Sequence, residues 1–193
     1  MAAICVIKDL QRLARKRVPR MFYEYVDAGS WSESTYRANE SAFNDIKLRQ
    51  RVAIDISHRS LQSTMVGQTV SMPVALAPVG MTGMQCADGE IKAARAAEQF
   101  GVPYILSTMS ICSIEDIAEH TSASFWFQLY LMRDRDFSLH LIKRAREAGC
   151  SALVLTLDLQ LPSQRHKDLR KVFSNPEMSL KVGITTYASA RRS

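Results

Sequence analysis

The chain has 193 residues, of which 47% are hydrophobic and 23% are charged, so it can bury the core of a folded domain and is too apolar for disorder throughout. Lys and Arg outnumber Asp and Glu by 25 to 19, a net charge of +6, which suits an acidic partner such as nucleic acid, an anionic membrane or a phosphorylated cofactor without choosing among them. The 4 cysteines lack CxxC spacing and form no zinc signature with histidine, which indicates reduced thiols in a cytosolic protein.

The N-terminal part of the chain contains two predicted helices followed by a polar stretch. Residues 8–17 place apolar side chains on one face of a helix, and residues 21–26 continue as a second helix after Pro19. We expect Gly29 to cap the C-terminal end of that second helix. Residues 30–60 are polar and mixed in character, which is typical of a segment that wraps around a domain.

The stretch from Ser60 to Ala87 has no charged residue and is a candidate membrane span. A spanning helix needs about 20 mainly apolar residues, whereas this stretch contains several polar side chains together with Pro73 and Pro78. Buried strands joined by turns fit this pattern better. Within the stretch, residues 66–70 predict a small hairpin.

From residue 73 onward, short apolar runs alternate with helical patterns. The predicted strands cover residues 73–77, 104–107, 125–130 and 152–157. The predicted helices cover residues 88–100, a short segment opening at Ser113, and residues 134–148. The strands are apolar nearly throughout, as expected when both faces of a parallel sheet are covered. This order predicts an α/β fold, either an open doubly wound sheet or a closed eight-stranded barrel.

Local signals mark the ends of these helices. Ser113 and Asp116 form a capping-box pattern, and Gly101 and Gly149 are predicted stop positions. The residues expected on the buried face of the 134–148 helix are Phe137, Leu141, Ala145 and Ala148.

Parallel α/β folds place functional residues at the carboxyl ends of their strands. In this chain these positions are Pro78, Val79, Gly80, Ser107, Thr108, Gln128, Tyr130, Thr156 and Asp158, with Arg165 on the following loop. They supply neutral hydrogen-bonding groups, one carboxylate and one guanidinium. This set suits a planar polar heterocycle with a small anion beside it, which Arg165 could grip through two parallel hydrogen bonds.

A purely structural role remains open at each of these positions. A Ser or Thr at a strand end more often bonds to the local backbone than to a ligand. Gln128 is the stronger candidate, because it follows two aromatic residues and a buried amide needs hydrogen-bond partners. Tyr25, taken alone, is more typical of a core or surface aromatic.

Several common functional motifs are absent from the sequence. It contains no GxGxxG after a strand, no phosphate-binding GKS or GKT, no HExxH and no GxSxG. The 4 histidines are scattered, and the 2 tryptophans do not interleave with a basic stripe. We therefore expect neither a metal site nor a nucleic-acid partner.

A series of short segments resembles one known family, the FMN-dependent α-hydroxy acid dehydrogenases and oxidases. The segments follow the family's order over about residues 5–170. They are Phe22-Tyr23-Glu24-Tyr25 with Gly29, Leu48-Arg49-Gln50-Arg51, Met72 through Gly80, Asp88-Gly89-Glu90, Leu106-Ser107-Thr108, Trp126 through Tyr130, Arg133-Asp134-Arg135, Thr156-Leu157-Asp158 and Gln164 through Asp168. The Ala-Pro-Val-Gly and Arg-Gln-Arg versions are most similar to the bacterial L-lactate dehydrogenase (cytochrome) branch.

The resemblance implies a (β/α)8 TIM barrel that binds FMN at its strand ends, of which about the first four βα units are present. It implies a helical and wrapping segment over residues 1–60, the first half of the barrel over 61–170, and a divergent tail over 171–193. The flavin contacts that it implies are Pro78, Val79, Gly80, Ser107, Gln128 and Thr156. The substrate contacts are Tyr25, Tyr130 and Arg165, and Asp158 would orient a catalytic histidine.

The chain also departs from the family pattern. Later units of the family hold a lysine beside the flavin, a histidine base in a His-Gly-Gly-Arg run, a second substrate arginine and phosphate-binding glycines, and none of these occurs here. Ser163 replaces the glycine that is usual in its loop. Residues 159–193 contain two prolines and no convincing strand, so a loop and a loose tail are expected, and the match decays after about residue 170.

The function implied is FMN-dependent oxidation of an L-2-hydroxy acid, above all L-lactate to pyruvate, by hydride transfer. This chain, without the base-bearing half, is expected to be inactive alone. The resemblance also implies a homo-oligomer, a respiratory-chain electron acceptor, and a cytoplasmic protein with peripheral contact at the inner face of the cell membrane. Two alternatives stay open: a non-catalytic module that pairs with a complementary half-barrel, and a basic protein that docks on anionic membranes.

Overall fold

The computed structural model describes residues 4–158 and 164–167. These residues form two compact units. We call residues 4–51 with 164–167 the N-terminal unit, and residues 52–158 the sheet unit.

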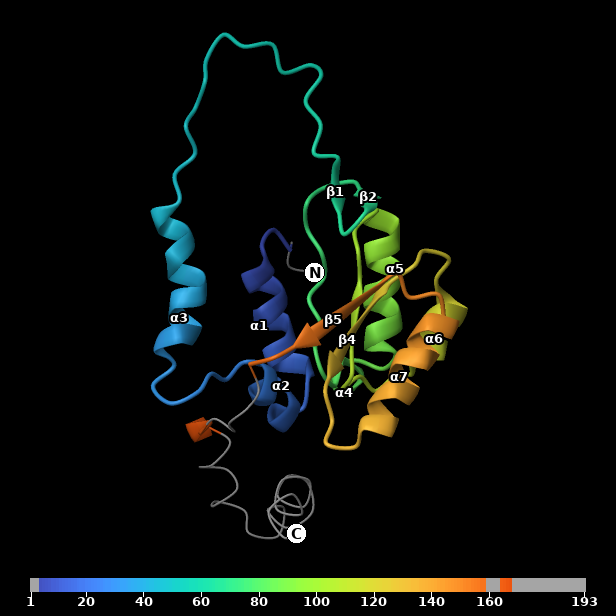
Figure 1. Ribbon diagram of the computed structural model, residues 1–193. Helices are drawn as coiled ribbons and strands as arrows, with labels where there is room; N and C mark the ends of the chain where they lie inside the picture. The colour runs from blue at the N-terminus through green and yellow to red at the C-terminus, as the bar shows by residue number, and fades with distance from the viewer. Residues whose placement is uncertain (1–3, 159–163, 168–193) are drawn as a thin grey trace. The chain divides into compact units, whose positions relative to one another are not determined.

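The N-terminal unit is helical (Figure 1). Its elements are α1 (Ile7–Arg17), α2 (Arg20–Val26), α3 (Ser34–Ser41) and the 3-10 helix η1 (Ala42–Asp45). The two predicted helices are confirmed, with Pro19 at the start of α2, where its missing N–H has no helical partner to lose. Helix α3 lies within the stretch that was expected only to wrap around a domain. It was not predicted, because its mixed polar sequence shows no apolar face.

The expectation that Gly29 caps α2 is wrong. Asp27 is the cap residue, and its backbone N–H donates to the carbonyl of Tyr23 at 2.9 Å. Gly29 is required for a different reason, since a Cβ there would lie 2.7 Å from the Cβ of Tyr36. Its small size, and not a left-handed backbone, lets the segment after α2 pass close to α3.

The sheet unit begins with a hairpin and continues as alternating helices and strands (Figure 1). The hairpin pairs β1 (Ser63–Met65) with β2 (Gln68–Val70), and both Val66 and Gly67 in its turn have positive φ, as two-residue hairpin turns require. The elements that follow are α4 (Thr82–Gln85), α5 (Gly89–Phe100), β3 (Ile105–Ser107), α6 (Ile114–His120), β4 (Trp126–Tyr130), α7 (Arg135–Glu147) and β5 (Ala152–Thr156).

Strands β3, β4 and β5 form a parallel sheet in sequential order, so the predicted parallel α/β fold is confirmed. The strand expected over residues 73–77 is reduced to a single parallel bridge between Leu76 and Tyr104. Leu76 donates to the carbonyl of Pro103 and accepts from the N–H of Ile105. Pro73 and Pro78 lie at the two ends of the expected strand and lack N–H donors, which limits strand pairing to the residues between them.

The helix ends follow the predicted signals. Ser113 accepts a hydrogen bond from the N–H of Asp116, whose carboxylate accepts from the N–H of Ser113, so the capping box is confirmed. Gly101 and Gly149 end α5 and α7 with φ of 65° and 79°, a conformation that glycine adopts without strain. Asp134 caps the start of α7 by accepting from the N–H of Phe137.

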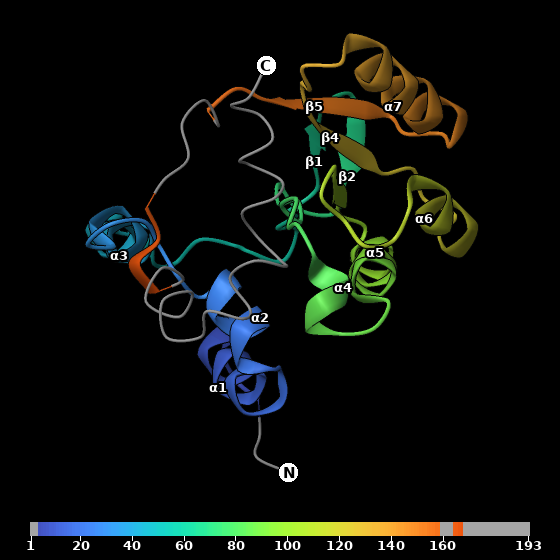
Figure 2. The same cartoon turned by 90° about the horizontal axis from the view of Figure 1, so that it is seen from below.

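The core lies between the sheet and the layer formed by α5, α6 and α7, which Figure 2 shows on one side of the strands. Leu106 and Ile117 are fully buried there, and Phe127 is nearly so. On α7, Leu141 and Ala145 are buried as predicted, whereas Phe137 is 48% exposed and Ser138 takes the buried position instead. Ser138 is polar but satisfied, because its hydroxyl donates to the carbonyl of Asp134.

Strand β5 differs from the prediction that every strand is covered on both faces. Its register places Leu153 beside Phe127 and Leu155 beside Leu129, so these leucines face the helical layer, yet each is 46% exposed. The described helices cover β3 and β4, and the outer face of β5 is only half covered.

Residues 60–87 form the hairpin, the bridge and α4 instead of one long helix. Of the helices in residues 4–158, none is long and apolar enough to cross a bilayer.

Candidate active site

The carboxyl ends of the three parallel strands hold one connected group of polar side chains. The amide of Gln128 on β4 lies at its centre: its Oε1 accepts from the hydroxyl of Ser107 on β3 at 3.3 Å, and its Nε2 donates to the hydroxyl of Thr156 on β5 at 2.8 Å. Ser107 and Gln128 are buried, with 4% and 1% of their surface exposed. We call these three residues the strand-end cluster.

Thr108, predicted as a strand-end residue but not among the flavin contacts that the resemblance implies, ties the end of β3 to β4. Its N–H donates to Oε1 of Gln128 at 3.2 Å, and its hydroxyl donates to the backbone carbonyl of Gln128. The same hydroxyl accepts from the N–H of Tyr130 at 3.2 Å. The only sequence signal for this role is a hydroxyl residue directly after Ser107 at a strand end.

The loop after the Leu76 bridge lies beside Ser107. It contains the predicted residues Pro78, Val79 and Gly80, and a Cβ added at Gly80 would lie 3.2 Å from the Cβ of Met109 and 3.9 Å from Oγ of Ser107. The glycine therefore permits this loop to approach the end of β3 closely. The N–H of Met81 donates to the carbonyl of Met109 at 2.8 Å, which fixes the approach.

The structure brings together most of the residues predicted to contact the heterocycle. Amide and hydroxyl groups from three strands and backbone groups from the 78–80 loop can each donate or accept hydrogen bonds. Such a set matches the alternating donors and acceptors along the edge of a planar polar ring. Tyr130, half-buried, ends β4, and Asp158, exposed, follows β5 by two residues.

The N-terminal unit brings together two other predicted residues, Tyr25 and Arg165. The guanidinium carbon of Arg165 lies 4.9 Å from the centre of the Tyr25 ring, a cation–π arrangement. Arg165 also donates to the backbone carbonyls of Tyr25 and Ala28, the latter at 2.9 Å. Sequence spacing gave no indication of this contact, because the partners are 140 positions apart.

Neighbouring contacts hold the 164–167 segment in the N-terminal unit. Lys167 forms an ion pair with Glu33 at 2.8 Å, and the N–H of Trp31 donates to the carbonyl of Gln164 at 2.8 Å. The hydrogen bond from Lys167 and the N–H of Gly29 lower the pKa of Glu33, and the hydrogen bond to Glu33 raises the pKa of Lys167. Both groups are therefore charged at neutral pH, and together they anchor the segment that carries Arg165.

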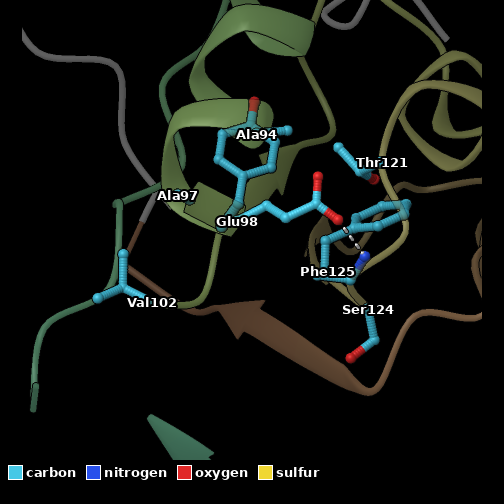
Figure 3. Close-up of a pocket in the computed structure, with 9 residues that line it drawn as sticks. Ala94, Ala97, Glu98, Val102, Thr121, Ser124 and Phe125 are labelled. Carbon is cyan, nitrogen blue, oxygen red and sulfur yellow. Dashed lines mark hydrogen bonds between the residues drawn. The ribbon is translucent and has the colours of Figure 1, made fainter. Parts of the chain in front are cut away.

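A pocket lies at the opposite, amino-terminal end of the sheet (Figure 3). It is lined mainly by side chains of α5, of the segment between α5 and β3 and of the segment leading into β4: Ala94, Ala97, Val102, Tyr104, Ala123 and Phe125, together with the more polar Glu98, Thr121 and Ser124. Glu98 reaches from α5 to that segment, where it accepts from the N–H groups of Ser122 and Ala123 at 2.8 Å each. Its carboxylate is thus occupied by backbone donors.

Comparison with known proteins gives a consistent result. The family model described as FMN-dependent dehydrogenase matches residues 14–192. An L-lactate dehydrogenase of Stenotrophomonas maltophilia (strain R551-3) is 44% identical over 173 residues, which are 90% of this chain and 46% of that protein. An L-lactate dehydrogenase of Acinetobacter baumannii (strain AYE) is 43% identical, over 90% of this chain and 45% of that protein. The chain spans about half the length of the curated relatives it matches.

Solved structures agree with the sequence matches. A monotopic membrane protein, (S)-mandelate dehydrogenase, superposes with a TM-score of 0.84 at 34% identity, covering 91% of this chain and 47% of that one. A mandelate oxidase superposes with a TM-score of 0.83 at 35% identity, covering 91% and 51%. The parallel βα units of the sheet unit thus correspond to part of a (β/α)8 barrel.

Proposed function

The chain belongs to the FMN-dependent dehydrogenase family, and from this premise we propose that it serves the FMN-dependent oxidation of an L-2-hydroxy acid, above all L-lactate to pyruvate. The observation that carries the proposal is the strand-end cluster, in which Ser107, Gln128 and Thr156 share hydrogen bonds at the carboxyl ends of neighbouring strands. The similarity to L-lactate dehydrogenases supports the choice of substrate.

FMN is the cofactor of this family, and the residues present fit a flavin. The buried amide of Gln128 and the hydroxyl groups of Ser107 and Thr156 would hold the polar edge of the ring. Pro78, Val79 and Gly80 would lie against the ring, since the glycine lets their loop run close to the end of β3. FMN held there would supply the hydride acceptor for oxidation of the carbon that bears the substrate hydroxyl.

The remaining predicted residues would bind and orient the hydroxy acid. Arg165 would pair with the substrate carboxylate, because its guanidinium is a permanent cation that forms charge-assisted hydrogen bonds with a carboxylate. Its stacking on Tyr25 and the carbonyls that it contacts limit its rotamers. Tyr25 and Tyr130 would contribute hydroxyl groups toward the carboxylate or the substrate hydroxyl.

Removal of the hydroxyl proton needs a base, and we propose that this chain does not supply it alone. Asp158 would orient a histidine base through a hydrogen bond, but residues 1–193 contain no His-Gly-Gly-Arg run. The chain's 4 histidines are scattered in the sequence, and His166 packs edge-on against Trp31 with ring centres 6.0 Å apart. The 193-residue chain on its own is therefore expected to bind without turning over.

Binding of FMN to the purified chain is the first test. Flavin fluorescence is followed as the chain is titrated, with riboflavin as the matched ligand that lacks the phosphate. We expect saturable quenching by FMN. Thermal unfolding in parallel should show a higher midpoint with FMN, because a ligand that binds only the folded state stabilises it. A folded chain that quenches the fluorescence of neither FMN nor riboflavin contradicts the proposed cofactor site.

Turnover is the second test. The chain, FMN and L-lactate are mixed with a dye acceptor, and dye reduction is compared with that of an intact L-lactate dehydrogenase. We expect no reduction above the flavin-only background, since no base is placed. Reduction at the rate of the intact enzyme would show that some residue of this chain takes the proton.

The partners and the location follow from the same proposal. An electron acceptor of the respiratory chain and association into a homo-oligomer are proposed for the protein in which this chain functions. Peripheral contact with the cytoplasmic face of the membrane is proposed as well. A similar (S)-mandelate dehydrogenase is a monotopic membrane protein, and the net charge of +6 favours an anionic surface.

A second candidate function is suggested by β5. Strand β5 ends the sheet order β3-β4-β5, so among the described residues one of its edges is unpaired, and such edges recruit partners. Leu153 and Leu155 on its outer face are also each 46% exposed. The chain would then act as a module that pairs with a complementary half-barrel. Sedimentation of the purified chain separates the two ideas: a monomer that unfolds cooperatively argues against the pairing module.

A further inference from the structure

Glu90 is a fully buried carboxylate near the start of α5, with 0% of its surface exposed. Its Oε1 accepts two backbone hydrogen bonds at 3.0 Å, one from the N–H of Gly83 and one from the N–H of Ile111. Gly83 is the second residue of α4, whose first N–H groups have no partner within the helix. Ile111 lies on the loop that follows β3. One oxygen atom thus joins two segments that are far apart in the sequence.

The junction around Glu90 is tightly packed. A Cβ added at Gly83 would lie 2.7 Å from the Cβ of Ile111 and 3.1 Å from Oε2 of Glu90. A side-chain hydrogen bond from Cys112 also lowers the pKa of the Glu90 carboxyl group, and burial together with the same bond raises the pKa of the Cys112 thiol. Backbone and side-chain donors thus converge on one buried carboxylate.

Glu90 is ionised at neutral pH. Burial by itself raises the pKa of its carboxyl group, but the hydrogen bonds from Ile111 and Gly83 outweigh this and leave the pKa below its ordinary value. An ionised acceptor forms stronger hydrogen bonds than a neutral one. The carboxylate is therefore a firm anchor for both loops.

The two loops that Glu90 joins are the ones proposed to contact the flavin. The first runs from Pro78 to Gly80 and leads directly into α4. The second leaves β3 at Ser107, whose hydroxyl accepts from the N–H of Met109 at 3.1 Å. Neither Gly83 nor Ile111 belongs to the proposed contact set, so Glu90 acts one layer behind it.

We propose that Glu90 is a positioning residue for the flavin site, holding the loop after the Leu76 bridge and the loop after β3 at the separation that the ring requires. The inference rests on the proposed function, because the separation of the two loops matters for binding only if a flavin lies between them. Glu90 itself would touch neither cofactor nor substrate.

Helix α5 offers a matched control at its other end. Glu98 also accepts two backbone N–H groups, those of Ser122 and Ala123, at 2.8 Å each. These bonds tie α5 to the segment before β4, at the amino-terminal end of the sheet. Replacing Glu98 removes the same chemistry from the same helix without touching the loops of the proposed site.

The experiment compares Glu90→Ala, Glu90→Gln and Glu98→Ala in the 193-residue chain. FMN affinity is measured by fluorescence titration, well below each variant's unfolding midpoint and corrected for the folded fraction. Backbone hydrogen exchange of Gly83 and Ile111 is measured without FMN. Glu90→Ala should weaken FMN binding on the order of tenfold and expose both amides, since two buried donors lose their acceptor. Glu90→Gln keeps an acceptor oxygen and should recover most of the affinity, and Glu98→Ala should leave affinity within about twofold.

The outcomes separate this inference from the proposed function. If the wild-type chain binds FMN and Glu90→Ala binds it equally well, the positioning role is wrong and the cofactor site stands. Equal losses in Glu90→Ala and Glu98→Ala would show a general stability effect and would also overturn it. If the wild-type chain does not bind FMN, the proposed function fails, and with it a role for Glu90 in a flavin site, whatever the exchange data show about the loops.

Discussion

The two ends of the parallel sheet use the same chemical groups in different surroundings. At the carboxyl end, Gln128 and Glu90 are buried, with 1% and 0% of their surface exposed. At the amino end, a second glutamine and a second glutamate, Gln68 and Glu98, are only half-buried. Gln68 accepts from the indole N–H of Trp126 at 3.1 Å and donates to Ser124 at 3.0 Å, so it bridges its neighbours as Gln128 does.

The difference lies in the free energy that each polar side chain loses when it leaves water. A half-buried amide or carboxylate keeps part of its hydration and stabilises the fold cheaply. A fully buried one must have its partners placed for it, or it costs about 1–3 kcal/mol. Among the described residues, the buried amide of Gln128 and the buried carboxylate of Glu90 both lie at the carboxyl end, where parallel α/β folds hold their ligands.

The largest expected effect comes from replacing each of the two glutamines with alanine in a separate variant. Gln128→Ala removes the group shared by Ser107 and Thr156, so it should weaken FMN binding on the order of tenfold to a hundredfold and lower the free energy of unfolding by about 1–3 kcal/mol. Gln68→Ala should cost about 1 kcal/mol of stability without weakening FMN binding. Flavin titration and urea unfolding measure both. Similar affinity losses in the two variants would remove the distinction between the ends.

Glycines at the two ends provide a smaller, purely steric contrast. Gly83→Ala would drive a Cβ to 2.7 Å from the Cβ of Ile111, and such overpacking costs about 1–3 kcal/mol. At the amino end, Gly101→Ala meets Ser71 at a milder 3.3 Å, and its cost of about 1–2 kcal/mol comes from the left-handed φ of 65°.

Urea unfolding should therefore rank Gly83→Ala as equal to or worse than Gly101→Ala, and flavin titration should show weaker binding for Gly83→Ala alone. A normal FMN affinity in Gly83→Ala, at full folding, would show that the junction behind the loops tolerates displacement.

The smallest effect concerns an ion pair between two helices of the outer layer, which sets a baseline for both ends. Arg144 donates to Glu115 at 2.6 and 2.8 Å, and this hydrogen bonding lowers the pKa of Glu115 from 4.5 to about 2. A lowered pKa in the folded state means that the stabilisation is present above pH 4.5 and disappears as the pH falls toward 2.

The pair is partly exposed, so its contribution should be at most about 1 kcal/mol. Arg144→Gln should lower the unfolding midpoint at pH 7, and the gap from wild type should close as the pH is lowered. Thermal unfolding followed by circular dichroism over that range measures it. A gap that stays constant in acid would assign the effect to lost packing of the arginine stem.

Much of the sheet unit could be predicted because its signals are local. The capping box at Ser113, the stop at Gly149 and the apolar run of β4 each depend on a few neighbouring residues. Two local expectations in the sheet unit failed. Pairing over residues 73–77 is limited to one bridge at Leu76. On α7 the buried position belongs to Ser138 instead of Phe137, because the apolar pattern marks a helix without fixing which of its positions the sheet covers.

The site was predictable where strand ends line up and not where side chains reach across. Ser107, Gln128 and Thr156 follow from topology, since carboxyl ends of parallel strands meet at one edge. Glu90 acts through backbone N–H groups of two segments outside its own helix, Gly83 and Ile111, which spacing along the chain does not reveal. The contact of Tyr25 with Arg165 belongs to the same class.

That contact also has a consequence for synthesis. Tyr25 and its arginine partner are 140 positions apart, so the ribosome must translate most of the chain before the two can meet. The entropy of closing so long a segment rises only slowly with its length, and the closed state is thermodynamically accessible. During synthesis, the contact between Tyr25 and Arg165 can form only after the βα units between them have left the ribosome, and these units can fold first. Until Arg165 has been translated, the N-terminal helices lack its contacts with Tyr25.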